Sequence, residues 1–270
     1  MASVAIFNSK GGVGKTTLAV NLAWEAARAG HRVLLWEMDE GGDSSWLLSE
    51  EASAPRPDME QVMNGLRMLE DFVHPSKFPG IAYIAGDASL RRTDNFFIRI
   101  RRERRVSKIM DELGRRFDLI VMDCAPGFSE ANRNILMLSD LVIVPTIPSI
   151  LSMRGMQRVR QFLTRYRDRA HPPILPVFSM VDRRRNAHKA ALQQHPQWPV
   201  IPMASEIEQM AARRAPLGAF APSGAGAALF GLLWEGIEDK LRKMRVIRSP
   251  QAAGPSVVAR IPNAALALPA

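Results

Sequence analysis

One glycine-rich segment near the start of this 270-residue chain constrains its fold more than any other feature. Residues 8–17 read Asn-Ser-Lys-Gly-Gly-Val-Gly-Lys-Thr-Thr, and the apolar run Val4–Phe7 comes directly before them. Leu18, Leu22 and Ala26 then recur at helical spacing. A turn that joins a buried strand to a helix N-terminus in this way directs its backbone N–H groups at an anion. The segment therefore predicts a phosphate-binding loop at the carboxyl end of the first strand.

The side chains of this loop predict a nucleoside triphosphate with magnesium as the ligand. Lys15 is placed to reach the β and γ phosphates, the hydroxyl of Thr16 to bind Mg²⁺, and Thr17 to contact the α phosphate. The other residues that we expect to line this loop around the nucleotide are Gly11, Gly12, Val13 and Gly14.

Two positions depart from a standard Walker A motif. Ser9 stands where that motif has glycine, and a second lysine, Lys10, comes five positions before Lys15. Lys-Gly-Gly-Val-Gly-Lys-Thr-Thr resembles the deviant Walker A motif of the ParA/MinD family, and the resemblance extends over residues 2–245. It implies ATP as the nucleotide, and a homodimer in which Lys10 reaches the phosphates bound by the partner subunit. Lys10 and Lys15 are therefore both expected to bind the nucleotide and to act in catalysis.

The remaining apolar runs predict a doubly wound, mainly parallel α/β sheet flanked by helices. The first helix is expected to end at Gly30, and the strand Arg32–Trp36 completes a βαβ unit. One ATPase domain is expected over residues 1–248, and the Ala/Pro-rich residues 249–270 are predicted to be a disordered tail. The further predicted strands are Ile81–Ala85, Leu119–Met122, Leu141–Val144, Ile174–Phe178 and Val200–Ile201.

An aspartate at the end of a buried apolar run predicts a magnesium ligand. Asp123 follows Leu119–Met122, and burial of its charge would be costly without a cation nearby. Asp123 also resembles the Walker B aspartate of the ParA/MinD family, whose strand-Asp-x-x-Pro-Gly element matches residues 123–127. The resemblance implies that the backbone N–H of Gly127 senses the γ phosphate.

A second acidic segment follows the strand Arg32–Trp36. It reads Glu-Met-Asp-Glu-Gly from residue 37 to residue 41, where the family has Asp-x-Asp-Pro-Gln. The resemblance makes Asp39 the aspartate that positions the attacking water, and we expect it to join Thr16 and Asp123 at the metal. Glu37 replaces the first aspartate of the family pattern, which leaves the geometry of this switch segment open.

The resemblance also indicates where the adenine base is held. Residues 180–183, Met-Val-Asp-Arg, match the segment that carries this contact in the family, which assigns Asp182 and Arg183 to the nucleotide site. Pro202 and Met203 are expected to add to the same pocket.

Basic residues outnumber acidic ones, and the net charge of +9 with a pI near 10.4 favours polyanionic partners. Arginines gather in residues 91–116, in two short clusters further on, and in the helix after Ser149. No base-reading motif accompanies them, so we expect nonspecific contacts with DNA phosphates; a solvated basic surface is the alternative. The predicted DNA-binding residues are Arg183, Arg184, Arg185, Arg213 and Arg214.

Several classes of protein are excluded by what the chain lacks. The single cysteine, Cys124, cannot form an internal disulfide or supply the paired ligands of an iron–sulfur cluster. No run of eighteen apolar residues occurs and the chain starts directly on a predicted strand, so we expect neither a membrane span nor a signal peptide. A cytoplasmic protein is the expectation.

Two functions remain, and the resemblance favours the ParA-like branch of the family. In that branch ATP closes a dimer, the dimer binds nucleoid DNA, and a ParB-like or other cargo adaptor triggers hydrolysis. The cargo would be a plasmid, a chromosome or a protein assembly such as a carboxysome or chemoreceptor cluster. The alternative is a MinD-like regulator associated with the membrane, which the basic segment Lys240–Arg248 at the end of the last predicted helix suggests.

Overall fold

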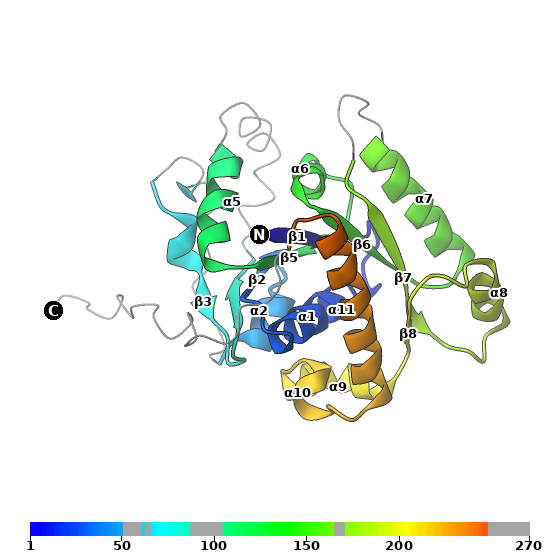
Figure 1. Cartoon of the computed structure of the whole chain (residues 1–270). Coiled ribbons are helices and arrows are strands. Elements are labelled where there is room, and N and C mark those ends of the chain that lie inside the picture. The colour runs from blue at the N-terminus through cyan, green and yellow to red at the C-terminus, as the bar shows by residue number, and fades with distance from the viewer. Residues whose placement is uncertain (51–60, 63–65, 87–104, 165–170, 248–270) are drawn as a thin grey trace.

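The computed structural model describes residues 1–50, 61–62, 66–86, 105–164 and 171–247. In this part of the chain an eight-stranded sheet forms the centre, with helices on both faces (Figure 1). The strand order is β3-β4-β2-β5-β1-β6-β7-β8, and every pairing is parallel except that of β3 with β4. The strands are β1 (Ala2–Ile6), β2 (Val33–Met38), β3 (His74–Pro75), β4 (Ile81–Ile84), β5 (Leu119–Cys124), β6 (Leu141–Thr146), β7 (Ile174–Val181) and β8 (Val200–Pro202).

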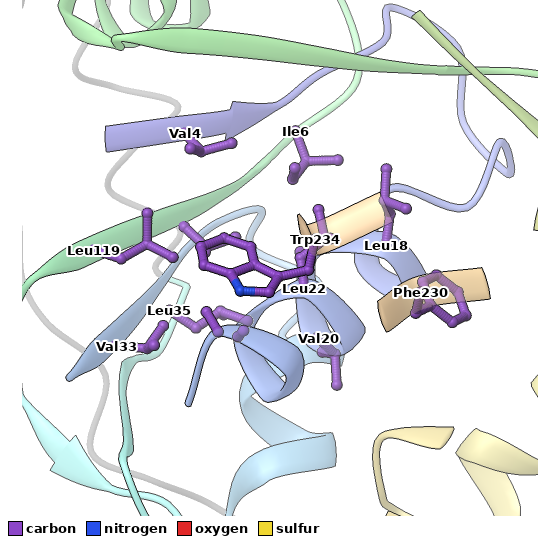
Figure 2. Packing of buried hydrophobic residues seen from close by; sticks show 14 of the residues in the cluster. Val4, Ile6, Leu18, Val20, Leu22, Val33, Leu35, Leu119, Phe230 and Trp234 are labelled. Carbon is purple, nitrogen blue, oxygen red and sulfur yellow. The ribbon is translucent and has the colours of Figure 1, made fainter. Parts of the chain in front are cut away.

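The central strands are apolar on both sides because helices cover both faces of the sheet. One core cluster lies between the sheet and α1, α2, α9, α10 and α11, and a second between the sheet and α5, α6 and α7. Figure 2 shows part of the first cluster, in which Trp234 of α11 lies among Val4, Leu35 and Leu119 of the strands. The helices are α1 (Lys15–Arg28), α2 (Asp43–Leu48), α5 (Arg105–Arg116), α6 (Glu130–Leu138), α7 (Ile150–Thr164), α8 (Asn186–Gln194), α9 (Ser205–Arg213), α10 (Leu217–Phe220) and α11 (Ala225–Lys243), with a 3-10 turn η1 (Leu69–Phe72).

The strand order indicates where in the sheet a ligand site is expected. β1 lies between β5 and β6, so the chain winds away from β1 in both directions across the sheet. In open parallel sheets, ligands bind at the carboxyl ends of the strands where the winding direction changes. The loop of residues 8–14 leaves β1 at that edge and leads into α1.

The predicted doubly wound sheet is confirmed, and each predicted strand is present with its ends moved by a few residues. The largest change is at β7, which continues to Val181 instead of ending at Phe178. Gly30 follows the end of α1 as expected, with φ of +92°. Strand β3 was not predicted, because two residues are too short to show an alternating pattern.

Some predictions fall outside the described residues. These are the tail 249–270, residues 91–104 of the arginine-rich segment, and Arg165 and Arg169, the last arginines expected on the helix after Ser149. Ile247, at the end of the described chain, is buried against the first core cluster. Among the described helices none combines the length and the apolar character needed to cross a membrane.

Candidate functional site

The phosphate-binding loop has the backbone that its glycines predict. Gly12 and Gly14 have φ of +67° and +86°. These left-handed values would be strained in a residue with a side chain. Gly14 is also the N-cap of α1, so the N–H groups of the first helical turn open toward the loop. This geometry suits the binding of an anion.

The loop is fixed by Asn8, its own first residue, and by two residues of β7. The amide of Asn8 donates to the carbonyl of Pro145 (2.7 Å), and its oxygen accepts from the N–H of Lys10 (3.1 Å). The hydroxyl of Ser179 donates to the carbonyl of Val13 (2.8 Å). Met180, with φ of +53°, brings its side chain beside Gly14. Sequence patterns did not identify these contacts, since their partners lie in β6 and β7, more than a hundred residues further along the chain.

The two lysines of the motif have different surroundings. The ammonium of Lys15 is buried and donates to the carbonyl of Lys10 (3.2 Å). Burial lowers the pKa of Lys15, while the nearby charges of Asp123 and Asp39 act in the opposite direction. Lys15 therefore lies inside the loop and close to both predicted acidic residues.

The side chain of Lys10 packs beside α7. A methyl group added at Gly155 would lie 3.7 Å from Cε and 3.9 Å from Cδ of Lys10. Among the described residues no carboxylate forms an ion pair with the Lys10 ammonium. The second lysine is thus a cation at the edge of the site without a charge partner in that part of the chain.

Asp123 is a buried carboxylate of β5 whose charge acts on Lys15. It is a register partner of Ile6 in β1 and of Glu37 in β2. Burial raises its pKa to about 7, and the charge of Glu37 adds to the rise, while the hydroxyl of Thr16 and the charge of Lys15 oppose it. Its Oδ2 is buried without a hydrogen-bond partner in the described structure.

These features fit a magnesium ion. Thr16 supplies a hydroxyl beside Asp123, and the unpaired Oδ2 is an oxygen ligand of the kind that Mg²⁺ prefers. Groups of three or more His, Cys, Asp or Glu side chains suited to a metal do not occur among the described residues. A magnesium ion here would therefore rely on phosphate oxygens and water for most of its ligands, which is usual at nucleotide sites.

Two carboxylates of the acidic segment 37–41, Glu37 at the end of β2 and Asp39 just after it, have different surroundings. Asp39 is half-buried, its Oδ1 accepts from the N–H of Gly41 (3.2 Å), and its charge acts on Lys15. Glu37 is fully buried, and within the described part of the chain its carboxylate accepts from the backbone N–H groups of Ser44, Ser45 and Gly86.

Gly127 lies in a loop that is tied directly to the phosphate-binding loop. Its φ is +97°, and its N–H donates to the carbonyl of Ser9 (3.1 Å). The amide of Asn132 in α6 donates to the carbonyls of Ala125 (3.0 Å) and Gly127 (2.9 Å). The N–H that was expected to sense the γ phosphate is therefore occupied by a carbonyl of the phosphate-binding loop itself.

The residues predicted to hold adenine follow neighbouring strands. Val181 and Pro202 are register partners in β7 and β8. Asp182 and Met203, the residues that follow them, therefore lie next to each other at the ends of these strands. The carboxylate of Asp182 accepts two hydrogen bonds from the guanidinium of Arg184 (2.9 and 3.1 Å), which hold its pKa down to about 2. Arg183 is exposed, and so is Met203, with an exposed fraction of 58%.

The predicted DNA-binding arginines differ in exposure and in the contacts that their side chains make with other residues. Arg183, Arg185 and Arg213 have exposed side chains. Arg184 is bound to Asp182. Arg214 donates to the carbonyls of Trp46 and Ser49 at the end of α2, and its guanidinium lies 4.9 Å from the Trp46 ring centre.

Fold and site together define a P-loop nucleotide-binding protein of the α/β class. Residues 1–175 match the family model described as an AAA domain. That match covers more than half of the chain, so the chain belongs to this family, that of the ParA/MinD P-loop ATPases.

Similarity to known proteins was found in sequence for one protein and in fold for two others. The chromosome partitioning protein ParA of Caulobacter vibrioides is 29% identical over 187 residues, which are 67% of this chain and 70% of that protein. The septum site-determining protein MinD of Pyrococcus horikoshii, solved with Mg-ADP, has a TM-score of 0.71 at 23% identity over 90% of this chain and 98% of its own. Cobyrinic acid a,c-diamide synthase of Mycobacterium smegmatis, solved with an ATP analog and magnesium, has a TM-score of 0.72 at 19% identity over 92% and 99%. The two structural similarities concern the fold alone, which proteins of different activities share.

Proposed function

We propose that this protein is a ParA-like positioning ATPase whose Mg-ATP-bound form is a homodimer. The observation that carries the proposal is the placement of Lys10. Its ammonium has no ion-pair partner in the described structure, while Lys15 already fills the cation position inside the loop. A second subunit that presents its own triphosphate would supply the missing anion. The 29% identity to a chromosome partitioning ParA supports the same branch of the family.

Each site residue then has a task in phosphoryl transfer. Lys15 holds the β and γ phosphates, Lys10 of one subunit neutralises charge on the nucleotide of the other, and Asp39 orients water for in-line attack. Thr16 and Asp123 would hold magnesium, which neutralises charge on the phosphates when bound. The chemistry requires little beyond positioning and charge stabilisation, and these residues supply both.

Nonspecific DNA is the proposed matrix for the dimer. The exposed arginines Arg183, Arg185 and Arg213 support it, because guanidinium groups bind phosphate oxygens without reading sequence. One subunit presents few such contacts, and dimerisation would double them. The protein would then work in the cytoplasm at the nucleoid, where a ParB-like or other cargo adaptor stimulates a slow hydrolysis.

Light scattering tests the dimer. The parent protein should double in mass when Mg-ATP is added, whereas Lys10→Ala should bind ATP and remain a monomer. Lys189→Ala removes an exposed lysine from α8 and should behave like the parent. Dimerisation of Lys10→Ala to the parental extent would end the proposal.

A MinD-like membrane function is the second candidate, since the last turns of α11 carry Lys240, Arg242 and Lys243. The contacts that α11 makes argue against this function. Arg242 pairs with Glu238 (2.7 Å) and Lys243 with Asp239 (2.6 Å), which neutralises part of the basic charge. Leu241 and Ile237 are buried in the core, so these apolar side chains near the end of the helix are not available to a membrane. Pelleting with DNA and with anionic liposomes, each with and without ATP, separates the two functions.

A further inference from the structure

Glu37 joins three parts of the fold through one buried carboxylate. Its Oε1 accepts from the N–H of Ser44 (2.9 Å), and its Oε2 accepts from the N–H groups of Ser45 (3.3 Å) and Gly86 (3.1 Å). Ser44 and Ser45 lie in the first turn of α2, and Gly86 follows β4, the neighbour of β2 in the sheet. Glu37 is only 1% exposed, so these bonds are shielded from water.

Asp39 lies within the segment that these bonds fix. It is two residues after Glu37, and its carbonyl oxygen lies so close to Gly86 that a Cβ at Gly86 would overlap it. The same Cβ would lie 3.1 Å from Cγ of Glu37. Glu37 thus holds α2 on one side of Asp39 and the backbone of Gly86 on the other.

We propose that Glu37 is a positioning residue, which sets the place of Asp39 without contacting the nucleotide. The inference rests on the proposed ATPase function and assigns a purpose to the glutamate that replaces aspartate here. Both carboxylate oxygens are taken by N–H donors, so Glu37 has a different role from its register partner Asp123, whose Oδ2 is unpaired.

The length of the side chain matters for this role. An aspartate at position 37 would carry its carboxylate about 1.5 Å further back, which is one C–C bond. The bonds to Ser45 and Gly86, at 3.3 and 3.1 Å, would then be stretched beyond hydrogen-bonding distance. Glutamate is therefore required for one side chain to bridge α2 and the end of β4.

The first test separates positioning from nucleotide binding. Glu37→Gln keeps one acceptor oxygen and places an NH₂ group against the remaining N–H donors. The segment should therefore lose part of its anchor, and Asp39 should be displaced. We expect kcat to fall at least about tenfold, since misplacement near 1 Å can cost about a hundredfold. The dissociation constant of a fluorescent ATP analogue should change less than about threefold, because the phosphate-binding loop is intact. Gly86→Ala displaces Asp39 from the other side. It should likewise lower kcat and leave the affinity for the ATP analogue nearly unchanged.

Two further measurements exclude a merely structural role. Glu37→Gln keeps only one acceptor oxygen, so at least one of the backbone amides of Ser44, Ser45 and Gly86 should exchange hydrogen at least about tenfold faster than in the parent. The double variant Glu37→Gln, Asp39→Ala should hydrolyse ATP no more slowly than Asp39→Ala alone, as expected for residues that act as a unit. Glu25→Gln, at another buried glutamate, is the matched control and should change neither exchange at these amides nor kcat.

Several results would overturn the inference. These are a kcat of Glu37→Gln or of Gly86→Ala within twofold of the parent, equal losses of kcat and ATP affinity, or additive effects in the double variant. The proposed function fails separately, through dimerisation of Lys10→Ala, and the exchange result at the three amides would then still decide whether Glu37 anchors the segment.

Discussion

The ammonium of Lys15 lies 3.2 Å from the main-chain carbonyl oxygen of Lys10, the residue whose own side chain packs on α7. One lysine of the motif is therefore held inward by the backbone of the other. When a nucleotide is bound, we expect a phosphate oxygen to accept from Lys15 in place of this carbonyl. Because Asp123 and Asp39 also act on its charge, Lys15 is kept in place before a nucleotide arrives.

Lys15→Ala should therefore lose nucleotide binding itself. A hydrogen bond to a charged group contributes about 1.5–3 kcal/mol, so binding of a fluorescent ATP analogue should weaken by at least about tenfold. Lys10→Ala is the internal comparison, since it should keep the affinity of the monomer. Equal affinities for the parent and Lys15→Ala would remove Lys15 from the phosphate site.

Asp39→Ala should trap the ATP-bound dimer. Loss of the carboxylate that orients water should slow hydrolysis by about a hundredfold, the usual contribution of such a group, while Lys15 and Thr16 still hold the nucleotide. Phosphate release and light scattering on the same sample measure both effects. A parental hydrolysis rate would place the water-orienting role on another residue.

The pH dependence of stability should report Asp123. Its pKa is about 7 in the folded protein and near 3.8 when unfolded, so between these values the folded state binds the extra proton. Stability should then fall as pH rises from about 4 to 7, by at most about 1.4 kcal/mol per pH unit, and level off above that range. Asp123→Asn should flatten this slope in urea titrations with EDTA. Identical slopes in both proteins would show that Asp123 titrates normally.

Binding to duplex DNA should need ATP and weaken steeply with salt. The slope of log binding constant against log salt concentration should become shallower by about 0.9 for each lost phosphate contact. Arg213→Ala should therefore reduce its magnitude by up to about 1.8 per dimer. Arg28→Ala is the control, because Arg28 is already paired with Glu25 at 2.9 Å. Affinity that is equal with and without ATP, or insensitive to salt, would exclude DNA as the switched partner.

Arg214→Ala should instead affect stability in the absence of DNA. This variant loses the hydrogen bonds to Trp46 and Ser49 that hold the end of α2. The free energy of unfolding should fall by about 1.5–3 kcal/mol, the range for hydrogen bonds to charged groups. Denaturant titration of Arg214→Ala beside Arg213→Ala measures it, and equal stabilities of the two variants would contradict the assigned role.

The sequence predicted those parts of the site that depend on local patterns. The phosphate-binding loop and Asp123 are recognisable because each directly adjoins a buried apolar strand. The role of Glu37 was not predictable, since it depends on Gly86, 49 residues further along the chain. Arg214 was assigned to DNA from its charge and from its place before the last helix, and its contacts with Trp46 span 168 residues. Long-range partners of this kind become visible only after the sheet has brought distant segments together.

The attachments of the phosphate-binding loop have a kinetic consequence. Asn8 ties the loop to β6 and Ser179 ties it to β7, so its conformational entropy is already lost when the chain folds. An incoming nucleotide meets a preorganised receptor, and its capture is limited by diffusion and charge and not by a slow ordering step. If Asp39 orients the attacking water as we propose, the duration of one turnover depends on the segment around Asp39 and not on the entry of the nucleotide.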